Sequence, residues 1–126
     1  MAETAGWRRY DLDERAFEFA EKVLSFVRLL PRAPATTELI RQVVRSSGSV
    51  GANYIEASES LGRKDFLMRA RICRKEAKET VYWLRLLKGT RPQLEVQRCS
   101  LIQEATELTR ILGAIVSRGE AREATL

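Results

Sequence analysis

Residues 45–66 read Arg45-Ser-Ser-Gly-Ser-Val-Gly-Ala-Asn-Tyr-Ile-Glu-Ala-Ser-Glu-Ser-Leu-Gly-Arg-Lys-Asp-Phe66, and this stretch decides the fold prediction. Serine and glycine weaken a helix interior, yet sequence typical of helices lies on both sides of the stretch. It is therefore either a loop or a helix whose small residues let another backbone come close. We favour the helix, because Gly48, Gly51 and Ala52 fall at helical spacing on nearly one face.

A polar pair follows these small residues. Asn53 and Glu56 are three residues apart, so a helix places them as neighbours. An amide and a carboxylate beside a flat face of small residues predict a surface that meets another helix or another chain. At such a surface, polar groups set register and partner choice rather than adding net stability.

Outside this stretch, apolar residues recur in steps of three and four. The periodicity predicts helices over about residues 13–30, 36–60, 64–88 and 92–117. Pro31 and Pro34 separate the first two helices, and Pro92 suits the first turn of the last one. No segment alternates as a strand would. Because the connections are short, the predicted fold class is all-α, an antiparallel up-down-up-down four-helix bundle.

The 126 residues fit one domain. We expect an N-terminal leader over residues 1–12, the bundle over residues 13–118 and a polar C-terminal tail over residues 119–126. On the first helix, the predicted buried residues are Ala16, Phe17, Ala20, Val23, Leu24, Val27 and Leu30. On the third helix, they are Phe66, Ala70, Cys73, Ala77, Val81, Leu84 and Leu87.

Three segments resemble the 23S rRNA intervening-sequence proteins, a family of four-helix bundles. They are Arg45-Ser-Ser-Gly-Ser-Val-Gly-Ala-Asn-Tyr-Ile-Glu-Ala57, Asp65-Phe-Leu-Met-Arg-Ala-Arg-Ile-Cys-Arg-Lys-Glu-Ala-Lys-Glu-Thr-Val-Tyr-Trp-Leu84 and Tyr10-Asp-Leu-Asp-Glu-Arg-Ala-Phe17. The resemblance extends from about Tyr10 to Ser117. The family is named for reading frames inside inserts of large-subunit rRNA genes, which describes a location and not an activity.

The resemblance also implies an assembly, because related proteins form pentameric rings. The contact residues suspected for this homopentamer are Arg45, Ser49, Gly51, Asn53 and Glu56. Accessory proteins of diversity-generating retroelements look like the same fold, form basic pentameric barrels and act with a reverse transcriptase and nucleic acid. The partners implied here are further copies of the chain, RNA or DNA, and a protein such as a reverse transcriptase.

Composition argues against catalysis. The chain has no histidine, which removes the commonest general base and the commonest metal ligand. Cys73 and Cys99 are too few for a disulfide framework, and neither has a neighbour at zinc-ligand spacing. Ser46, Ser47 and Ser49 lack a histidine to activate them. We therefore expect a protein that is not an enzyme, with no catalytic residue, no metal and no cofactor.

Targeting signals are also lacking in the sequence. The first six residues do not combine a basic start with an apolar core, as a signal peptide does. The longest apolar runs are far too short to cross a membrane. The expectation is a cytoplasmic protein without a membrane partner.

The net charge of +5 provides the functional hypothesis. Lys64, Arg71, Lys75 and Lys78 are spaced to form one stripe on the third helix, and Arg74 lies beside it. Lysine and arginine neutralise phosphates, so we assign these five residues to binding of RNA or DNA. Two alternatives stay open. The stripe is only the solvated face of a helix, or the protein is an interaction and assembly module without a nucleic-acid role.

Four glutamates on the second and third helices allow two uses. Glu56, Glu59, Glu76 and Glu79 could form a carboxylate cluster, but di-metal bundles of this kind also require Glu-x-x-His. We therefore expect Glu76 and Glu79 to pair with nearby Arg or Lys. Glu56 is expected to meet a basic residue across the bundle or across a subunit interface.

Overall fold

Four helices make up nearly all of the described part of the chain. A computed structural model describes residues 9–88 and 91–124, apart from the side chains of residues 9 and 10. Its helices are α2 (Arg9–Val27), α3 (Pro34–Ser58), α4 (Arg63–Leu86) and α5 (Pro92–Ala124). No strand occurs over these two ranges, which confirms the predicted all-α bundle of four helices.

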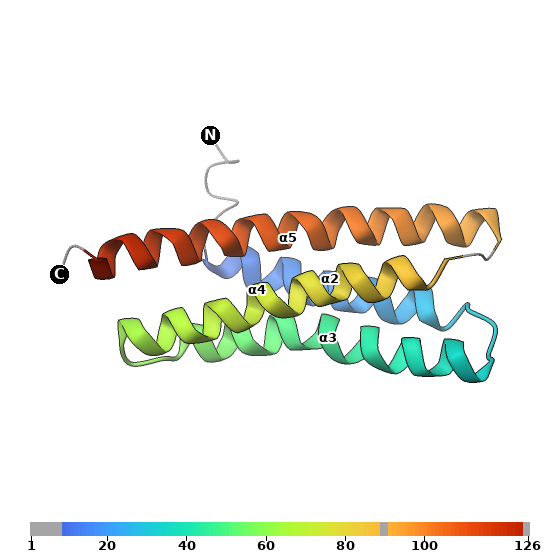
Figure 1. Ribbon diagram of the computed structural model, residues 1–126, viewed down its shortest axis with the longest axis horizontal. Coiled ribbons are helices and arrows are strands. Elements are labelled where there is room, and N and C mark those ends of the chain that lie inside the picture. The colour runs from blue at the N-terminus through green and yellow to red at the C-terminus, as the bar shows by residue number, and fades with distance from the viewer. Residues whose placement is uncertain (1–8, 89–90, 125–126) are drawn as a thin grey trace.

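The four helices lie beside one another along one long axis (Figure 1). Each helix starts at the end of the bundle where the preceding one stops, as the colours in Figure 1 show. α3 and α4 share the most extensive contact, followed by α4 with α5, α2 with α3, and then α2 with α5. α4 therefore has a neighbour on each side and presents an outer face along its length.

The helix boundaries follow from local chemistry. At the end of α2, the N–H groups of Leu29 and Leu30 donate to carbonyl oxygens three residues earlier, which tightens the last turn before Pro31. Pro34 opens α3 and Pro92 opens α5, at positions where the missing N–H has no helical partner to lose. α2 begins earlier than predicted, within the segment expected as a leader.

α5 also extends through most of the segment expected as a polar tail. Its added turns pack against α4, where Leu67 lies against Gly119 and both Leu67 and Val116 are buried. A Cβ atom at Gly119 would come within 2.5 Å of Leu67 Cδ2, so glycine is what allows this approach. Glu120 adds an ion pair of 2.9 Å to Arg71 of α4. These contacts explain why the helix continues.

The core is one apolar cluster to which all four helices contribute. The prediction for the first helix was wrong at Phe17 and Leu24, which are exposed, while Phe19 and Phe26 are buried. The buried residues of α2 repeat in steps of four and three from Leu12, and Phe17 falls just outside that face.

Most of the predicted core positions on α4 are confirmed as buried: Ala70, Cys73, Ala77, Leu84 and Leu87. Phe66 and Val81 are only half-buried. α4 additionally buries two polar side chains, Glu76 and Thr80, each of which has a partner on α3.

α3 runs unbroken through the serine and glycine segment, as predicted. The small-residue face is nevertheless divided between two surroundings. Gly51 faces α2, where a Cβ atom would lie 3.5 Å from Cβ of Ala16. Gly48 and Ala52 are exposed. The segment thus serves packing within the chain on one side and leaves small residues on the surface on the other.

Candidate nucleic-acid interface

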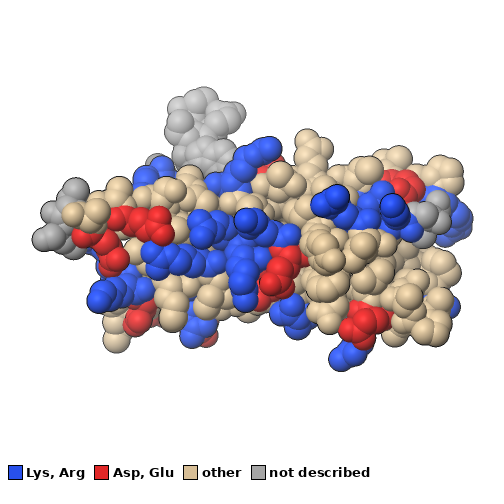
Figure 2. Space-filling model, viewed as in Figure 1, with Lys and Arg blue, Asp and Glu red and all other residues tan. Residues whose placement is uncertain are grey.

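The predicted basic stripe lies on the outer face of α4. Lys64, Arg71, Lys75 and Lys78 are exposed, and Arg74 is half-buried. Helical spacing places the four exposed cations on one side of α4. Figure 2 shows Lys and Arg side chains in two groups on this face of the molecule, one over the amino-terminal half of α4 and one toward its carboxyl-terminal end.

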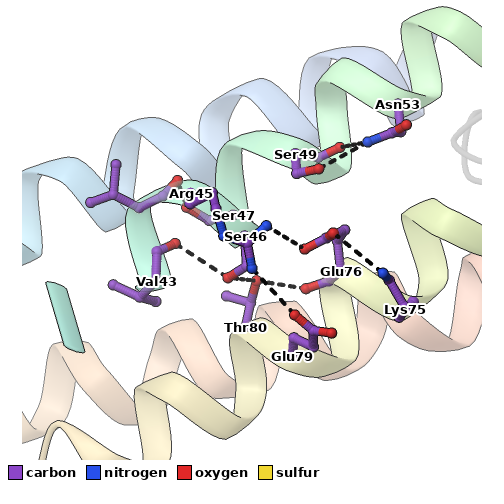
Figure 3. A network of polar contacts seen from close by, with 11 residues as sticks. Val43, Arg45, Ser46, Ser47, Ser49, Asn53, Lys75, Glu76, Glu79 and Thr80 are labelled. Carbon is purple, nitrogen blue, oxygen red and sulfur yellow. Dashed lines mark hydrogen bonds and ion pairs between the residues drawn. The ribbon is translucent and has the colours of Figure 1, made fainter. Parts of the chain in front are cut away.

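The glutamates of α4 turn away from this stripe and toward α3. Arg45 Nη2 lies 3.4 Å from Glu79 Oε1, and Arg45 Nη1 lies 3.5 Å from Glu76 Oε1 (Figure 3). The expected pairing of these two glutamates with a basic residue is confirmed, and the partner is on the neighbouring helix. Within the stripe, Lys75 also contacts Glu76, with a long distance of 3.9 Å between Nζ and Oε2.

Most of the stripe is therefore not neutralised. Arg71 donates to Glu120 of α5 at 2.9 Å. Over residues 9–88 and 91–124, no ion pair involves Lys64, Arg74 or Lys78. An exposed cation without an acidic partner can neutralise a phosphate without first breaking an ion pair. The outer face of α4 consequently carries an excess of positive charge.

The carboxylate of Glu76 is buried, with 8% of its side chain exposed. Its Oε1 atom accepts no hydrogen bond from the described residues, so the guanidinium of Arg45 is its main compensation. Burial of a carboxylate is costly unless a cation offsets it. Arg45, predicted as an oligomer contact, thus also holds α3 against α4 within its own chain.

Two hydroxyl groups complete this α3–α4 contact. Thr80 Oγ1 donates to the backbone oxygen of Glu76 at 2.8 Å, which leaves Ser46 Oγ as the donor to Thr80 Oγ1, also at 2.8 Å (Figure 3). Both side chains are fully buried. The serines that weaken helix propensity are therefore used for packing, and no nucleophile is exposed at Ser46.

Two more of the predicted oligomer contacts bond to each other. Asn53 Nδ2 donates to the hydroxyl and the backbone oxygen of Ser49, at 2.9 and 3.0 Å. Arg69 of α4 donates to Asn53 Oδ1 at 3.1 Å. The amide of Asn53 therefore faces α4, whereas Glu56 is exposed to solvent. Among the described contacts no hydrogen bond joins Asn53 to Glu56, so the two do not act as a pair within the chain.

An ion-pair cluster between α2 and α5 was not found from the sequence. Arg15 Nε lies 2.7 Å from Glu104 Oε2, and Arg15 Nη2 lies 2.7 Å from Glu107 Oε1. The hydrogen bond to Glu104, helped by Glu107, raises the pKa of Arg15 above its usual value despite partial burial. Arg15 and Glu104 are 89 positions apart, so no local pattern signals their contact.

Exposed apolar side chains were also missed. Phe17 is 58% exposed and Ile55 is 59% exposed. Phe17 follows Ala16, which contacts Gly51, and Ile55 lies one helical turn beyond Gly51, so both flank the same α2–α3 contact. We call this surface the α2–α3 apolar area; its members are Phe17, Leu24, Gly48, Ala52 and Ile55.

The remaining side chains to consider are the possible metal ligands and the two cysteines. Within residues 9–88 and 91–124, no three His, Cys, Asp or Glu side chains lie close enough together to hold a metal ion. Burial raises the pKa of the Cys73 thiol to about 12, and Cys99 is exposed. None of the described helices is long and apolar enough to cross a membrane.

Fold and surface together define a small all-helical bundle with a basic outer helix. Residues 8–114 match the 23S rRNA-intervening sequence protein family. The match extends over most of the chain, so the chain belongs to this family.

A solved structure is similar over nearly the same length. It is a protein of unknown function from the S23 ribosomal protein family of Bacteroides thetaiotaomicron, 32% identical in sequence, with a TM-score of 0.73. The similarity covers 86% of this chain and 97% of that one. No curated protein matches the chain.

Proposed function

We propose that this protein is a non-enzymatic, up-down-up-down four-helix bundle that assembles with copies of itself and binds RNA or DNA through the basic stripe of α4. The observation that carries the proposal is the division of charge on that helix. The exposed cations of the stripe lie on one side of the helix, while Glu76 and Glu79 pair with Arg45 on α3. Extensive pairing within α4 would have supported a merely solvated face, and among the described residues the only such ion pair is the long contact of Lys75 with Glu76.

Assembly and binding support each other in this proposal. One stripe supplies only a few phosphate contacts, each of which releases counterions. In a ring of identical chains the stripe recurs at fixed spacing, so a second contact forms at high effective concentration. A pentameric ring in the cytoplasm, acting with a protein such as a reverse transcriptase, belongs to the same proposal through the family resemblance.

The test is a charge reversal that spares the ion pair between α4 and α5. We choose Lys64→Glu, Lys75→Glu and Lys78→Glu together, and keep Arg71 because it pairs with Glu120 of α5. Binding of fluorescent RNA and DNA, single- and double-stranded, is measured across a salt titration. Wild type is expected to lose affinity steeply with salt, and the variant to bind more weakly with a salt slope smaller by about three.

A matched control separates the stripe from overall charge. Lys22→Glu, Arg28→Glu and Arg32→Glu reverse three exposed cations on and after α2, with the same change in net charge. The control is expected to retain more affinity than the stripe variant. Equal losses in the two variants would remove the stripe assignment, and absence of wild-type binding at low salt would remove the nucleic-acid function.

The α2–α3 apolar area favours a second candidate, a protein-interaction and assembly module without a nucleic-acid role. Large exposed apolar groups beside small ones are typical of contact surfaces. Gly51 is a poor position for testing this, because a Cβ there would already contact Ala16 at 3.5 Å and a larger side chain would disturb packing within the same chain. Ile55 projects from the same area and is the better position.

A further inference from the structure

An aromatic residue interrupts the basic face of α4. Tyr82 follows Lys75 and Lys78 at helical spacing, so the three side chains share one side of the helix. Tyr82 is 54% exposed. Exposed Arg85 and Lys88 follow it toward the carboxyl-terminal end of α4, where Figure 2 shows a second basic group. Along the helix, Tyr82 therefore lies between the cations of the stripe and Arg85.

The ring is held in place by its neighbour. Tyr82 and Trp83 make an edge-to-face contact, with ring centroids 5.0 Å apart and an interplanar angle of 72°. Trp83 packs against the apolar core. An exposed ring supported in this way loses little conformational entropy when a ligand binds to it.

A pocket of about 360 Å³ lies beside this ring; its lining consists of Tyr82, Arg85, Leu86, Lys88 and Arg98. A volume of this size is at the lower end of the range for small ligands. It combines one aromatic side chain with several cations, which suits a flat ring that carries a phosphate.

The cations of the pocket differ in availability. Arg98 Nη2 donates to Glu95 at 2.6 Å and Nη1 to the carbonyl of Leu84 at 3.2 Å, and 13% of its side chain is exposed. Arg98 is therefore a fixed wall of the pocket. Among the described residues, Arg85 and Lys88 have no ion-pair partner, so their charge is available to an anion.

We propose that the carboxyl-terminal end of α4 binds an unpaired base of single-stranded nucleic acid, stacked on Tyr82, with the adjoining phosphates neutralised by Arg85 and Lys88. The inference rests on the proposed nucleic-acid function and specifies its ligand. Phosphate contacts alone do not distinguish single strands from duplexes, whereas stacking on a side chain requires a base whose face is open. Tyr82 thus gives the basic face a preference for single strands.

The experiment compares variants of the full chain on three fluorescent probes: unstructured single-stranded RNA, single-stranded DNA and a DNA duplex. Tyr82→Ala is expected to bind both single strands roughly tenfold more weakly, since stacking of one base contributes on that order. Its affinity for the duplex and its salt slope are expected to equal those of wild type, because no charge is removed.

Two variants serve as controls. Tyr82→Phe keeps the stacking ring and is expected to bind single strands as wild type does. Met68→Ala removes another exposed apolar side chain from α4 without removing an aromatic ring, and it is also expected to bind as wild type does. A loss by Met68→Ala as large as that by Tyr82→Ala would overturn the stacking role.

The outcomes separate the two proposals. Wild-type affinity of Tyr82→Ala for single strands, or an equal loss on duplex DNA, would overturn the stacking site while the stripe variant still decides the binding function. A wild-type protein that binds none of the three probes would overturn both.

Discussion

Ser46 of α3 and Thr80 of α4 share a hydrogen bond of 2.8 Å between their hydroxyl oxygens, and both side chains are fully buried. The Thr80 hydroxyl in turn donates a hydrogen bond to the backbone carbonyl of Glu76. Two short side chains at this position let α3 and α4 pack closely while every hydroxyl keeps a partner. A segment with low helix propensity is thus stabilised as a helix by its tertiary contact.

This contact predicts two different costs at Ser46. Ser46→Ala removes one hydrogen bond and keeps the volume, so the free energy of unfolding is expected to fall by about 1 kcal/mol. Ser46→Leu adds volume to a buried contact and is expected to cost more, on the order of 2–3 kcal/mol. Urea unfolding followed by circular dichroism measures both. A Ser46→Leu protein as stable as Ser46→Ala would show that the contact is not closely packed.

The ion pair of Arg45 with Glu76 predicts that Arg45→Ala lowers the stability of the protein and that a second substitution, at Glu76, recovers it. Arg45→Ala leaves a buried carboxylate without its cation and is expected to cost about 1–2 kcal/mol, less than in a fully buried pair because half of Arg45 is exposed. Glu76→Gln in the Arg45→Ala protein is expected to recover most of that loss.

The same cycle at Glu79 is the control. Glu79 also contacts Arg45 but is far more exposed than Glu76, so Glu79→Gln is expected to recover little. Equal recovery by both glutamine substitutions would mean that burial of Glu76 is not what makes Arg45 important.

Periodicity was sufficient for the number and approximate places of the helices, because apolar residues at steps of three and four define them locally. It was insufficient for the face of α2, where Phe17 and Phe19 are equally apolar and only packing decides which is buried. The end of α5 was missed for a related reason. The contact of Gly119 with Leu67 stabilises it and joins positions far apart in the sequence.

The candidate site likewise has features that the sequence predicted and features that depend on tertiary packing. Helical spacing was enough to place Lys75 and Lys78 on one face, because that depends only on local geometry. Spacing could not show that Glu76 and Glu79 turn toward Arg45, since the position of α3 beside α4 is a tertiary property. The exposure of Tyr82 likewise depends on which side of α4 its neighbours cover.

Two glycines of α5 predict opposite responses to alanine. A Cβ at Gly113 would lie at an ordinary 3.9 Å from Arg74 Cδ, so Gly113→Ala is expected to stabilise the protein by about 0.5–1 kcal/mol through helix propensity. Gly119→Ala must displace Leu67 and is expected to destabilise by about 1–2 kcal/mol. Thermal and urea unfolding measure both, and a stabilising Gly119→Ala would contradict the close approach of α5 to α4.

The buried thiol of Cys73 predicts a loss of stability at alkaline pH. Its pKa is raised by burial from 9.0 to about 12, so the unfolded chain releases this proton first. The buried neutral thiol makes its full contribution to the free energy of unfolding below pH 9, and this contribution is lost as the pH rises from there toward 12. Wild type is therefore expected to lose stability more steeply than Cys73→Ala as the pH rises from 9 toward 12.

Thiol labelling provides the control for that assignment. At pH 8, exposed Cys99 is expected to react in the folded protein and Cys73 only after unfolding. Rapid reaction of both thiols in the folded state would contradict the burial of Cys73.

The α2–α3 apolar area predicts how the assembly responds to a charge. Ile55→Glu places a carboxylate on a surface that must lose water when two copies meet, so light scattering at micromolar concentration is expected to show a smaller species than wild type. Leu61→Glu, at a fully exposed loop position outside this area, is the matched control and is expected to assemble as wild type does. A wild-type monomer would refute self-assembly altogether. An Ile55→Glu protein of unchanged size would move the contact to another face, where exposed Arg45 and Glu56 are the next residues to reverse.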